Sequence, residues 1–298
     1  MSNSSHHSVD LMPKYLPHMQ HKDVMSMAMS PLDRQHWIEP DQDYPRYLNH
    51  KLALHKQGQR HIFDALPSSY EAQVELASAL RHHLLADHSS LYCPLAAGLC
   101  YLPDGIELPA STQQPLWNAS LWVADDVLIM QKLNDQYCLT AASLCSPSSW
   151  HLAEKIGQPM ARIHDPVPTL HEKLTPKIDR FFDHLTVENP IQRFNWSLQA
   201  SNELGQFPED KQIYPANTPL YYRCERQTLT RLPQTNAIAF TIRVYIYPMM
   251  ALAQVPHALT QLKAGIDAMP GSVKAYKDII YFAPALQKYF SDLSSLKG

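Results

Sequence analysis

Alternating apolar and polar positions mark the clearest element of the chain, an extended segment at residues 237–247. Apolar side chains occupy every second position there, at Ile238, Phe240, Ile242, Val244 and Ile246. A period of two residues is typical of a β-strand with two different faces. The preceding segment 220–231 also has an extended pattern, and LPQTNA between the two suits a hairpin loop. The pattern therefore predicts an antiparallel pair of strands.

A second hairpin is predicted earlier in the chain, from strands at 119–132 and 137–145. Both segments are rich in apolar residues, WVADDVLIMQK in the first and YCLTAASLC in the second. Asn134 and Asp135 stand between them, and these residue types favour a tight turn.

Helical spacing begins at Ser68, which forms a capping-box pattern with Glu71 ahead of an apolar run. Leu76, Leu80 and Leu84 continue that run on one helix face. The spacing predicts a helix from residue 68 onward.

Further helices are predicted at 149–158, from Thr175-Pro176 onward, up to about residue 268, and over 272–290. The pair Thr175-Pro176 places a capping residue before a proline at the first helical position. Antiparallel hairpins flanked by helices indicate an α+β fold in a single domain, with an antiparallel sheet enclosed by helices. Residues 1–30 are expected to form a flexible arm, and residues 31–298 to form the domain.

Composition excludes several functions for this chain of 298 residues. It has 8 glycines, 24 prolines and 16 histidines. No two glycines form a GxG, and none stands before a Lys-Ser/Thr pair. The dinucleotide fingerprint, the P-loop and the GxSxG nucleophile elbow are therefore absent.

Charge and cysteine content set the expected environment. The formal net charge of −3 gives no basic field for binding nucleic acid. Five cysteines without a CxxC pair indicate reduced thiols rather than a disulfide framework. No apolar run reaches membrane-spanning length, and the first residues lack signal-peptide features. We expect a cytoplasmic protein without a membrane segment.

His164 is the histidine with the most distinctive context. Pro166 and Pro168 follow it in IHDPVP, and proline favours extended backbone in the residue before it. A histidine fixed by such a stiff segment suits an axial iron ligand. The alternative is that His164 belongs to the background, because most of the sixteen histidines are expected to be packed or surface residues.

Arginines concentrate on the two C-terminal strands, in RCERQTLTRLP and the strand after it. Arginine binds carboxylates through two parallel hydrogen bonds, so the group could hold haem propionates or an acidic substrate. Glu225 could pair with an ammonium group, and Trp196 in RFNW could stack on a cofactor. The alternatives are a salt-bridged strand face and a core tryptophan. The arginines are Arg223, Arg226, Arg231 and Arg243.

Six segments, taken together and in this order, resemble one family. They are PSSW, EKIG, IHDPVP, QRFNW, RCERQTLTRLP and AIAFTIRVYIYP. The chain resembles the haem-dependent oxidative N-demethylase alpha subunit family from about Trp37 to about Ile280. This resemblance implies a PAS-like antiparallel sheet that encloses haem b.

The resemblance also implies an activity and partners. The family's reaction removes a methyl group from a small secondary amine such as dimethylamine with O2, releasing formaldehyde. Electrons come from NADPH through a separate flavin and iron–sulfur reductase subunit, and a folate-binding subunit takes the formaldehyde. Since this chain lacks nucleotide motifs, those cofactors would bind to partner subunits.

Carried onto this sequence, the resemblance makes His164 the proximal haem ligand, and Glu225 a candidate either for binding the amine or for a structural pair with arginine. Candidates for contacts with the haem are Lys155, Trp196, Arg223, Arg226, Arg231 and Arg243. The segment VADDV departs from the family's QEDL-like pattern, so Asp125 and Asp126 match it loosely. The alternative function is a non-catalytic haem-binding sensor or scaffold subunit with a PAS-like fold.

Overall fold

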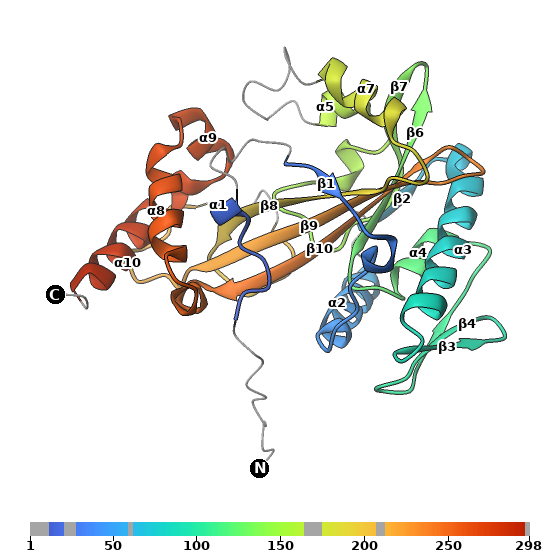
Figure 1. Ribbon diagram of the computed structural model, residues 1–298, viewed down its shortest axis with the longest axis horizontal. Helices are drawn as coiled ribbons and strands as arrows, with labels where there is room; N and C mark the ends of the chain where they lie inside the picture. The colour runs from blue at the N-terminus through green and yellow to red at the C-terminus, as the bar shows by residue number, and fades with distance from the viewer. Residues whose placement is uncertain (1–11, 21–27, 59–61, 164–174, 207–211, 296–298) are drawn as a thin grey trace.

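A computed structural model describes residues 12–20, 28–58, 62–163, 175–206 and 212–295 (Figure 1). Its largest element is a seven-stranded sheet in which every pairing between neighbouring strands is antiparallel. In spatial order the strands are β1 (Ser30–Pro31), β8 (Ile191–Gln199), β9 (Tyr221–Arg231), β10 (Ile238–Pro248), β6 (Asp126–Leu133), β7 (Gln136–Ser143) and β2 (Phe63–Ala65).

Both predicted hairpins are confirmed. Strands β9 and β10 pair along their whole length, from Arg231 opposite Ile238 to Tyr221 opposite Pro248. The turn between β6 and β7 places Asn134 and Asp135 at φ values of 48° and 64°, which these residue types tolerate better than most. A smaller three-stranded sheet contains β3 (Tyr92–Leu95), β4 (Gly98–Tyr101) and β5 (Ile106–Pro109).

The first strand of the β6–β7 hairpin starts later than the predicted residue 119. Helix α4 (Pro115–Ser120) precedes it, and β6 begins at Asp126. The buried Lys51 side chain donates to the carbonyls of Ser120, Val123 and Asp125 at 2.6 to 3.1 Å. Those carbonyls bind an ammonium group instead of a neighbouring strand, which explains the late start.

The helices predicted from residue 68 and at 149–158 need correction. Helix α3 (Tyr70–Asp87) follows a 3-10 turn at Pro67–Ser69, and Ser69 rather than Ser68 is its N-cap. The predicted helix at 149–158 is a 3-10 turn at Leu152–Glu154, followed by the short helix α5 (Met160–Ile163). Residues 157 and 158 instead exchange backbone hydrogen bonds with Leu139 at the edge of β7.

At the C-terminal end, α8 (Ala258–Ala268) ends as predicted, but the helix expected over 272–290 is broken. It consists of α9 (Gly271–Tyr276), a 3-10 turn at Ile279–Phe282 and α10 (Ala283–Ser295). Asp278 adopts a φ of 59° at the break. Helix α7 (Thr175–His184) begins at the predicted residue.

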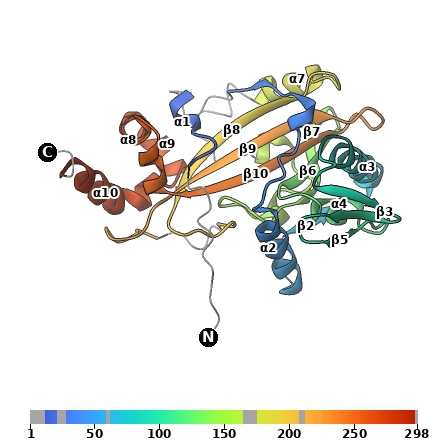
Figure 2. The same ribbon diagram turned by 60° about the horizontal axis from the view of Figure 1, so that its bottom comes forward.

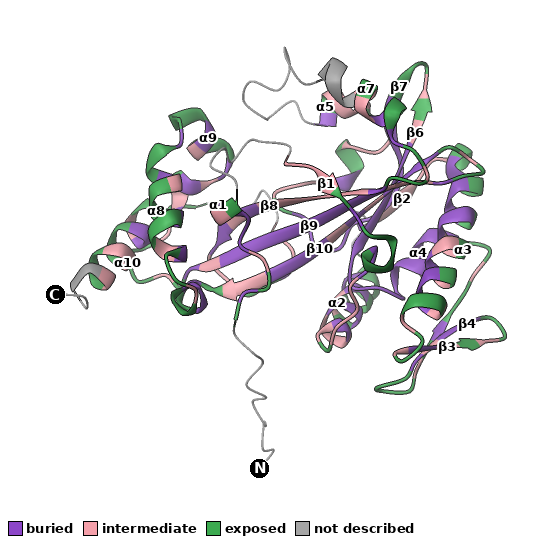
Figure 3. Ribbon diagram, in the orientation of Figure 1, coloured by how far each residue is buried: buried purple, intermediate pink, exposed green. Residues whose placement is uncertain are grey.

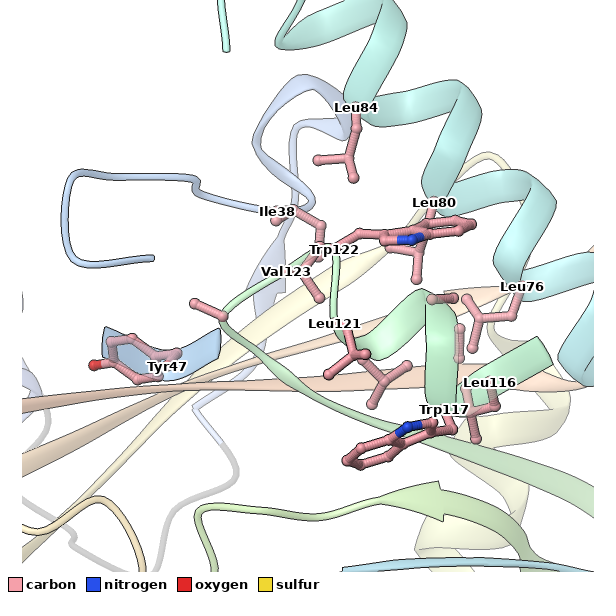
Figure 4. Close-up of a cluster of buried hydrophobic side chains, with 14 of the residues drawn as sticks. Ile38, Tyr47, Leu76, Leu80, Leu84, Leu116, Trp117, Leu121, Trp122 and Val123 are labelled. Carbon is pink, nitrogen blue, oxygen red and sulfur yellow. The ribbon is translucent and has the colours of Figure 1, made fainter. Parts of the chain in front are cut away.

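Apolar side chains form three buried clusters around the large sheet. Helices flank the sheet at both ends (Figure 2), and strands β9 and β10 are buried over most of their length (Figure 3). The first cluster joins α3, α4 and α2 (Tyr44–Lys56) to the sheet and contains Leu76, Leu80 and Trp122 (Figure 4). The second lies under α8 to α10 and the 3-10 turn Met249–Gln254. The third lies between α5, α7 and strands β6 and β7.

The N-terminal segment, defined as residues 12–20 and 28–43, crosses the sheet in front of β8, β9 and β10 (Figure 1). It contains α1 (Pro17–Gln20), β1 and a 3-10 turn at Arg34–His36. Leu16 and His18 are buried. Part of the expected arm is therefore packed against the sheet. No helix in the described part of the chain has the length and apolarity that crossing a bilayer requires.

Candidate functional site

The arginine-rich strands divide their side chains between two faces of the sheet, because successive strand residues point to opposite sides. Arg223, Glu225, Gln227, Leu229 and Arg231 define the Glu225 face, which α5 and α7 cover in part. The other side is the Arg226 face. It carries Cys224, Arg226 and Thr228, with Arg243 opposite Arg226 on β10. The four arginines therefore do not converge on one site.

On the Arg226 face, the acidic N-terminal segment neutralises both arginines. Nη2 of Arg243 donates to both carboxylate oxygens of Asp41 at 2.8 Å, and its guanidinium lies 3.8 Å from the ring centroid of Tyr47. Arg226 donates to the backbone carbonyls of His36 and Trp37, and its Nε lies 3.5 Å from Glu39. This face joins the N-terminal segment to the sheet.

Glu39 is the centre of that junction. Its carboxylate accepts hydrogen bonds from Tyr15 at 2.6 Å, Lys14 at 2.7 Å and Tyr245 at 2.8 Å. Burial opposes ionisation, but Arg226 and the three donors hold the pKa of Glu39 below its ordinary value. Glu39 is therefore ionised, and its contacts bind the N-terminal segment to strands β9 and β10.

Asp125 differs from the other charged residues of this face, because its carboxylate has no hydrogen-bond partner among the described residues. Asp126 pairs with Ile242 on β10. If the same register is continued by one residue, Asp125 lies opposite Arg243. Both Asp125 carboxylate oxygens, and Nε and Nη1 of Arg243, are buried without a hydrogen-bond partner among the described residues. Burial raises the pKa of Asp125 to about 6, although Arg243 acts in the opposite direction.

Glu225, predicted as the residue for the amine, lies in a polar network on its own face. Its carboxylate accepts from Arg223 Nε at 3.0 Å, Gln227 Nε2 at 3.1 Å and Asn195 Nδ2 at 3.3 Å. Arg223 also donates to the carbonyls of Ser146 and Leu204, at 2.6 and 2.7 Å. Despite burial, Arg223 lowers the pKa of Glu225, so the carboxylate is charged.

Lys277 extends this network from the C-terminal helices. Its Nζ donates to Asn195 Oδ1 at 2.9 Å and to the carbonyl of Trp196 at 2.7 Å. Burial lowers the pKa of Lys277 to about 8, and Glu225 opposes that change. Lys277 was not among the candidates, because in the sequence it is one lysine on a helical segment.

Trp196 lies in the second apolar cluster and points to the Arg226 face, since it pairs with Cys224. Its ring stacks on Tyr222 with centroids 5.7 Å apart and an interplanar angle of 17°. The structure therefore places Trp196 in core packing on the opposite side of the sheet from Glu225.

Beside Glu225 the same face becomes apolar. Val244 lies opposite Glu225, Ile242 opposite Gln227, and Phe240 opposite Leu229. Partly buried apolar side chains from β8, β10, α5, α7 and the 150–156 segment adjoin the third cluster: Trp150, Ile156, Met160, Phe181, Ile191, Phe240 and Ile242. An ionised carboxylate next to an apolar wall is the principal feature of the Glu225 face.

The side chains of the Glu225 face can be compared with those that haem requires. A porphyrin needs apolar walls for its ring and a hydrogen-bond donor for its propionates. The partly buried side chains around Phe240 supply the wall. Arg193, opposite Gln227 on β8, has a buried Nε without a partner in the described part of the chain. The residues present fit a flat apolar group with an anionic edge.

The remaining predicted contacts lie elsewhere or outside the described residues. Arg231 donates to the carbonyls of Phe182 and Leu185 at the end of α7. Lys155 follows the 3-10 turn beside the edge of β7, and strands β6 and β10 separate β7 from β9. His164 lies outside the described residues.

The described residues before His164 end at Ile163. Ile163, the last residue of α5, is buried in the third cluster with Leu229 and Ile238 of the sheet. No group of three or more histidine, cysteine, aspartate or glutamate residues that could hold a metal ion occurs among the described residues.

Comparison with protein families supplies the remaining observation. The model of the family described as "haem-dependent oxidative N-demethylase, alpha subunit-like" matches residues 28–287. This range includes the N-terminal segment from residue 28, the whole large sheet and both faces of β9. The chain belongs to the haem-dependent oxidative N-demethylase, alpha subunit-like family.

Proposed function

We propose that this chain is the haem-binding subunit of an oxidative N-demethylase that acts on a small secondary amine such as dimethylamine. It would use O2 and electrons from a partner reductase and release formaldehyde. The observation that carries the proposal is the juxtaposition of the charged Glu225 network with the apolar wall at Ile242 and Phe240. Family membership supports both haem and oxidative N-demethylation.

The apolar wall would contact one porphyrin surface, and Arg193 would donate to a propionate. His164 is the proposed proximal ligand, because it follows the buried Ile163 directly and because Pro166 and Pro168 come soon after it in the sequence. Haem b, when bound, supplies oxygen activation and one-electron chemistry. In this proposal the sheet and helices form a PAS-like domain around the cofactor.

Glu225 would bind the protonated amine. A carboxylate offers about four lone-pair sites, and Arg223, Gln227 and Asn195 already use three of them. The remaining site suits one N–H group of a small ammonium ion. The adjacent apolar side chains would receive the methyl groups and exclude water. The N–CH3 bond would therefore point in a defined direction, from the carboxylate toward the apolar wall.

Electrons would come from another subunit. The chain has no GxGxxG or P-loop motif for a nucleotide, and the family is described as alpha subunit-like. A flavin-containing reductase that uses NADPH, and a folate-binding subunit that takes formaldehyde, are the proposed partners. A cytoplasmic location would place all of these components together.

Formaldehyde release tests this function. The haem-loaded chain, dimethylamine, O2 and a surrogate reductase should release formaldehyde and methylamine in equal amounts. Glu225→Gln removes the charge that faces the ammonium, so kcat/KM should fall at least about tenfold, which corresponds to about 1.4 kcal/mol. Glu71→Gln, at an exposed position in the first turn of α3, is the matched control and should retain activity.

The outcomes separate the enzyme from its alternative. Haem binding without formaldehyde release under any reductant would favour a non-catalytic sensor or scaffold subunit. Equal activity in the Glu225→Gln variant and the wild type would show that Glu225 serves only as the structural partner of Arg223.

A further inference from the structure

Two of the five cysteines lie directly opposite each other in the small sheet. Strands β3 and β4 form a hairpin in which Cys93 pairs with Cys100, and the next pair along is Tyr92 with Tyr101. Both cysteines are free thiols of intermediate exposure. Directly opposite residues of antiparallel strands project to the same side, with Cβ atoms about 4.5–5.5 Å apart.

The register of this pair is fixed from both sides. At one end Gly98 has a φ of 129°, and a Cβ atom there would overlap the carbonyl oxygen of Leu108 on β5. At the other end the buried Tyr92 and Tyr101 rings pack with centroids 5.4 Å apart. A slip of the strands would disrupt both contacts, so the two cysteines stay opposite each other.

This spacing is close to that of a disulfide. Bridged cysteines have Cα atoms about 4.4–6.8 Å apart, and opposite residues in an antiparallel pair have Cα atoms about 4.5–5.5 Å apart. The thiols also influence each other: desolvation and the neighbouring Cys93 raise the pKa of Cys100. Bridged cysteines also have Cβ atoms about 3.5–4.5 Å apart, so closure of a bridge would draw the two strands about 1 Å closer together at this pair.

The other three cysteines differ from this pair. Cys138, Cys145 and Cys224 are buried, and burial raises the pKa of each thiol. Cys138 lies opposite Gln131, and Cys224 lies opposite Tyr245 and Trp196. Neither has a cysteine across the strand.

We propose that Cys93 and Cys100 form a redox site, which closes to an intramolecular disulfide by exchange with a low-molecular-weight disulfide. One thiolate attacks a sulfur of the reagent, a mixed disulfide forms, and the reagent's own S–S bond breaks to release one thiol. The second cysteine thiolate then attacks the protein-bound sulfur and releases the second thiol. The two cysteines lose two protons and two electrons, and the reagent gains them.

This site is separate from the proposed haem face. Figure 1 shows β3 and β4 beside the lower end of α3, whereas α5 and α7, which cover part of the Glu225 face, lie at the top of the molecule. Because the pKa of Cys100 is raised, the thiol form predominates near neutral pH, and the rate of exchange should increase as the pH rises.

Treatment of the folded full chain with oxidised glutathione at pH 8 tests the proposal. Intact-mass analysis should show the loss of two hydrogen atoms without a retained glutathione, and peptide mapping should link Cys93 to Cys100. In Cys93→Ser the reaction should stop at a glutathione adduct on Cys100. Cys138→Ser, at a buried position outside the pair, should form the bridge as the wild type does.

Three results would overturn the proposal: stable glutathione adducts on the wild-type pair, bridges to another cysteine in the folded chain, or no reaction at all. Since the bridge is measured in the wild type, the outcome does not depend on whether a variant folds. Haem binding and formaldehyde release are not involved in the readout, so a failure here leaves the proposed function unaffected.

Discussion

At the scale of single residues, buried charges organise this protein, and most of them are matched. Arg223 binds Glu225 and two carbonyls, and Arg243 binds Asp41. The density of arginine was visible in the sequence, but the division between two faces follows from strand alternation together with distant partners. Asp41 lies 202 positions from Arg243, and no local pattern connects them.

Asp125 is predicted to lower stability when it is ionised. Its folded pKa of about 6 is above the ordinary 3.8, so the folded state binds the proton more tightly than the unfolded state. The free energy of unfolding should therefore fall as the pH rises from about 4 to about 6 and stay level above that range. Asp125→Asn should stabilise the fold by about 3 kcal/mol at pH 8 and by well under about 1 kcal/mol at pH 4.

Urea unfolding at both pH values measures this difference. Asp104→Asn, at an exposed position, is the control and should leave the free energy of unfolding unchanged at both pH values. An equal effect of Asp125→Asn at pH 4 and pH 8 would contradict the assignment of a raised pKa.

His83 is predicted to make the N-terminal segment sensitive to acid. Its Nε2 accepts from the backbone N–H of Ile38 at 3.2 Å, which requires the neutral ring. Desolvation, and then His88, lower its pKa from 6.5, while Asp87 opposes the change. The stabilisation is complete above pH 6.5 and is lost as the pH falls toward the folded pKa, because the unfolded state then binds more protons.

His83→Gln should flatten the decline of the unfolding free energy below pH 6.5, and amide exchange at Ile38 should become less dependent on acid. The exposed neighbour on the same helix, His82→Gln, should keep the wild-type slope. A wild-type slope in His83→Gln would show that this hydrogen bond does not determine the acid response.

At the scale of elements, the strands were predicted more accurately than the helices. Alternation placed β9 and β10 within one or two residues, because both strands have distinct faces. The helices expected at 149–158 and 272–290 are interrupted by contacts with distant strands. Residues 157 and 158 pair with Leu139, and Lys277 reaches into β8, and neither contact has a signature in local spacing.

Lys277 is predicted to hold the C-terminal helices against β8. Lys277→Met removes the donor to Asn195 Oδ1 and the Trp196 carbonyl, leaving two buried acceptors unpaired. The expected cost is about 1–3 kcal/mol in the free energy of unfolding. Amide exchange should also become faster in α8 to α10.

Lys288→Met provides the matched control. Lys288 forms an exposed pair with Asp292 in α10, and such pairs contribute about 0.2–0.5 kcal/mol. If the two methionine variants lose the same stability, Lys277 is not the anchor of these helices.

At the scale of the whole molecule, the sequence predicted an α+β chain and its family, and both are confirmed. The candidate site could be predicted only in part. Glu225 and the arginines were visible as a motif, whereas Asn195 and Lys277 complete the network by tertiary contact. The apolar wall at Phe240 was visible as one strand face, but its position beside Glu225 depends on the pairing of β9 with β10.

The central claim is that haem binds on the Glu225 face with His164 as its proximal ligand. The most direct test is a haem titration of the full chain, followed by its Soret absorption. Phe240→Glu would place a charge in the proposed wall, His164→Ala would remove the ligand, and Leu52→Glu changes an exposed position on α2 as a control.

We predict saturation at one haem per chain for the wild type and Leu52→Glu. Phe240→Glu should bind haem at least about tenfold more weakly, and His164→Ala should show an altered Soret band together with reduced occupancy. A wild-type chain that does not shift the haem spectrum, or a Phe240→Glu variant that binds as the wild type does, would contradict the account.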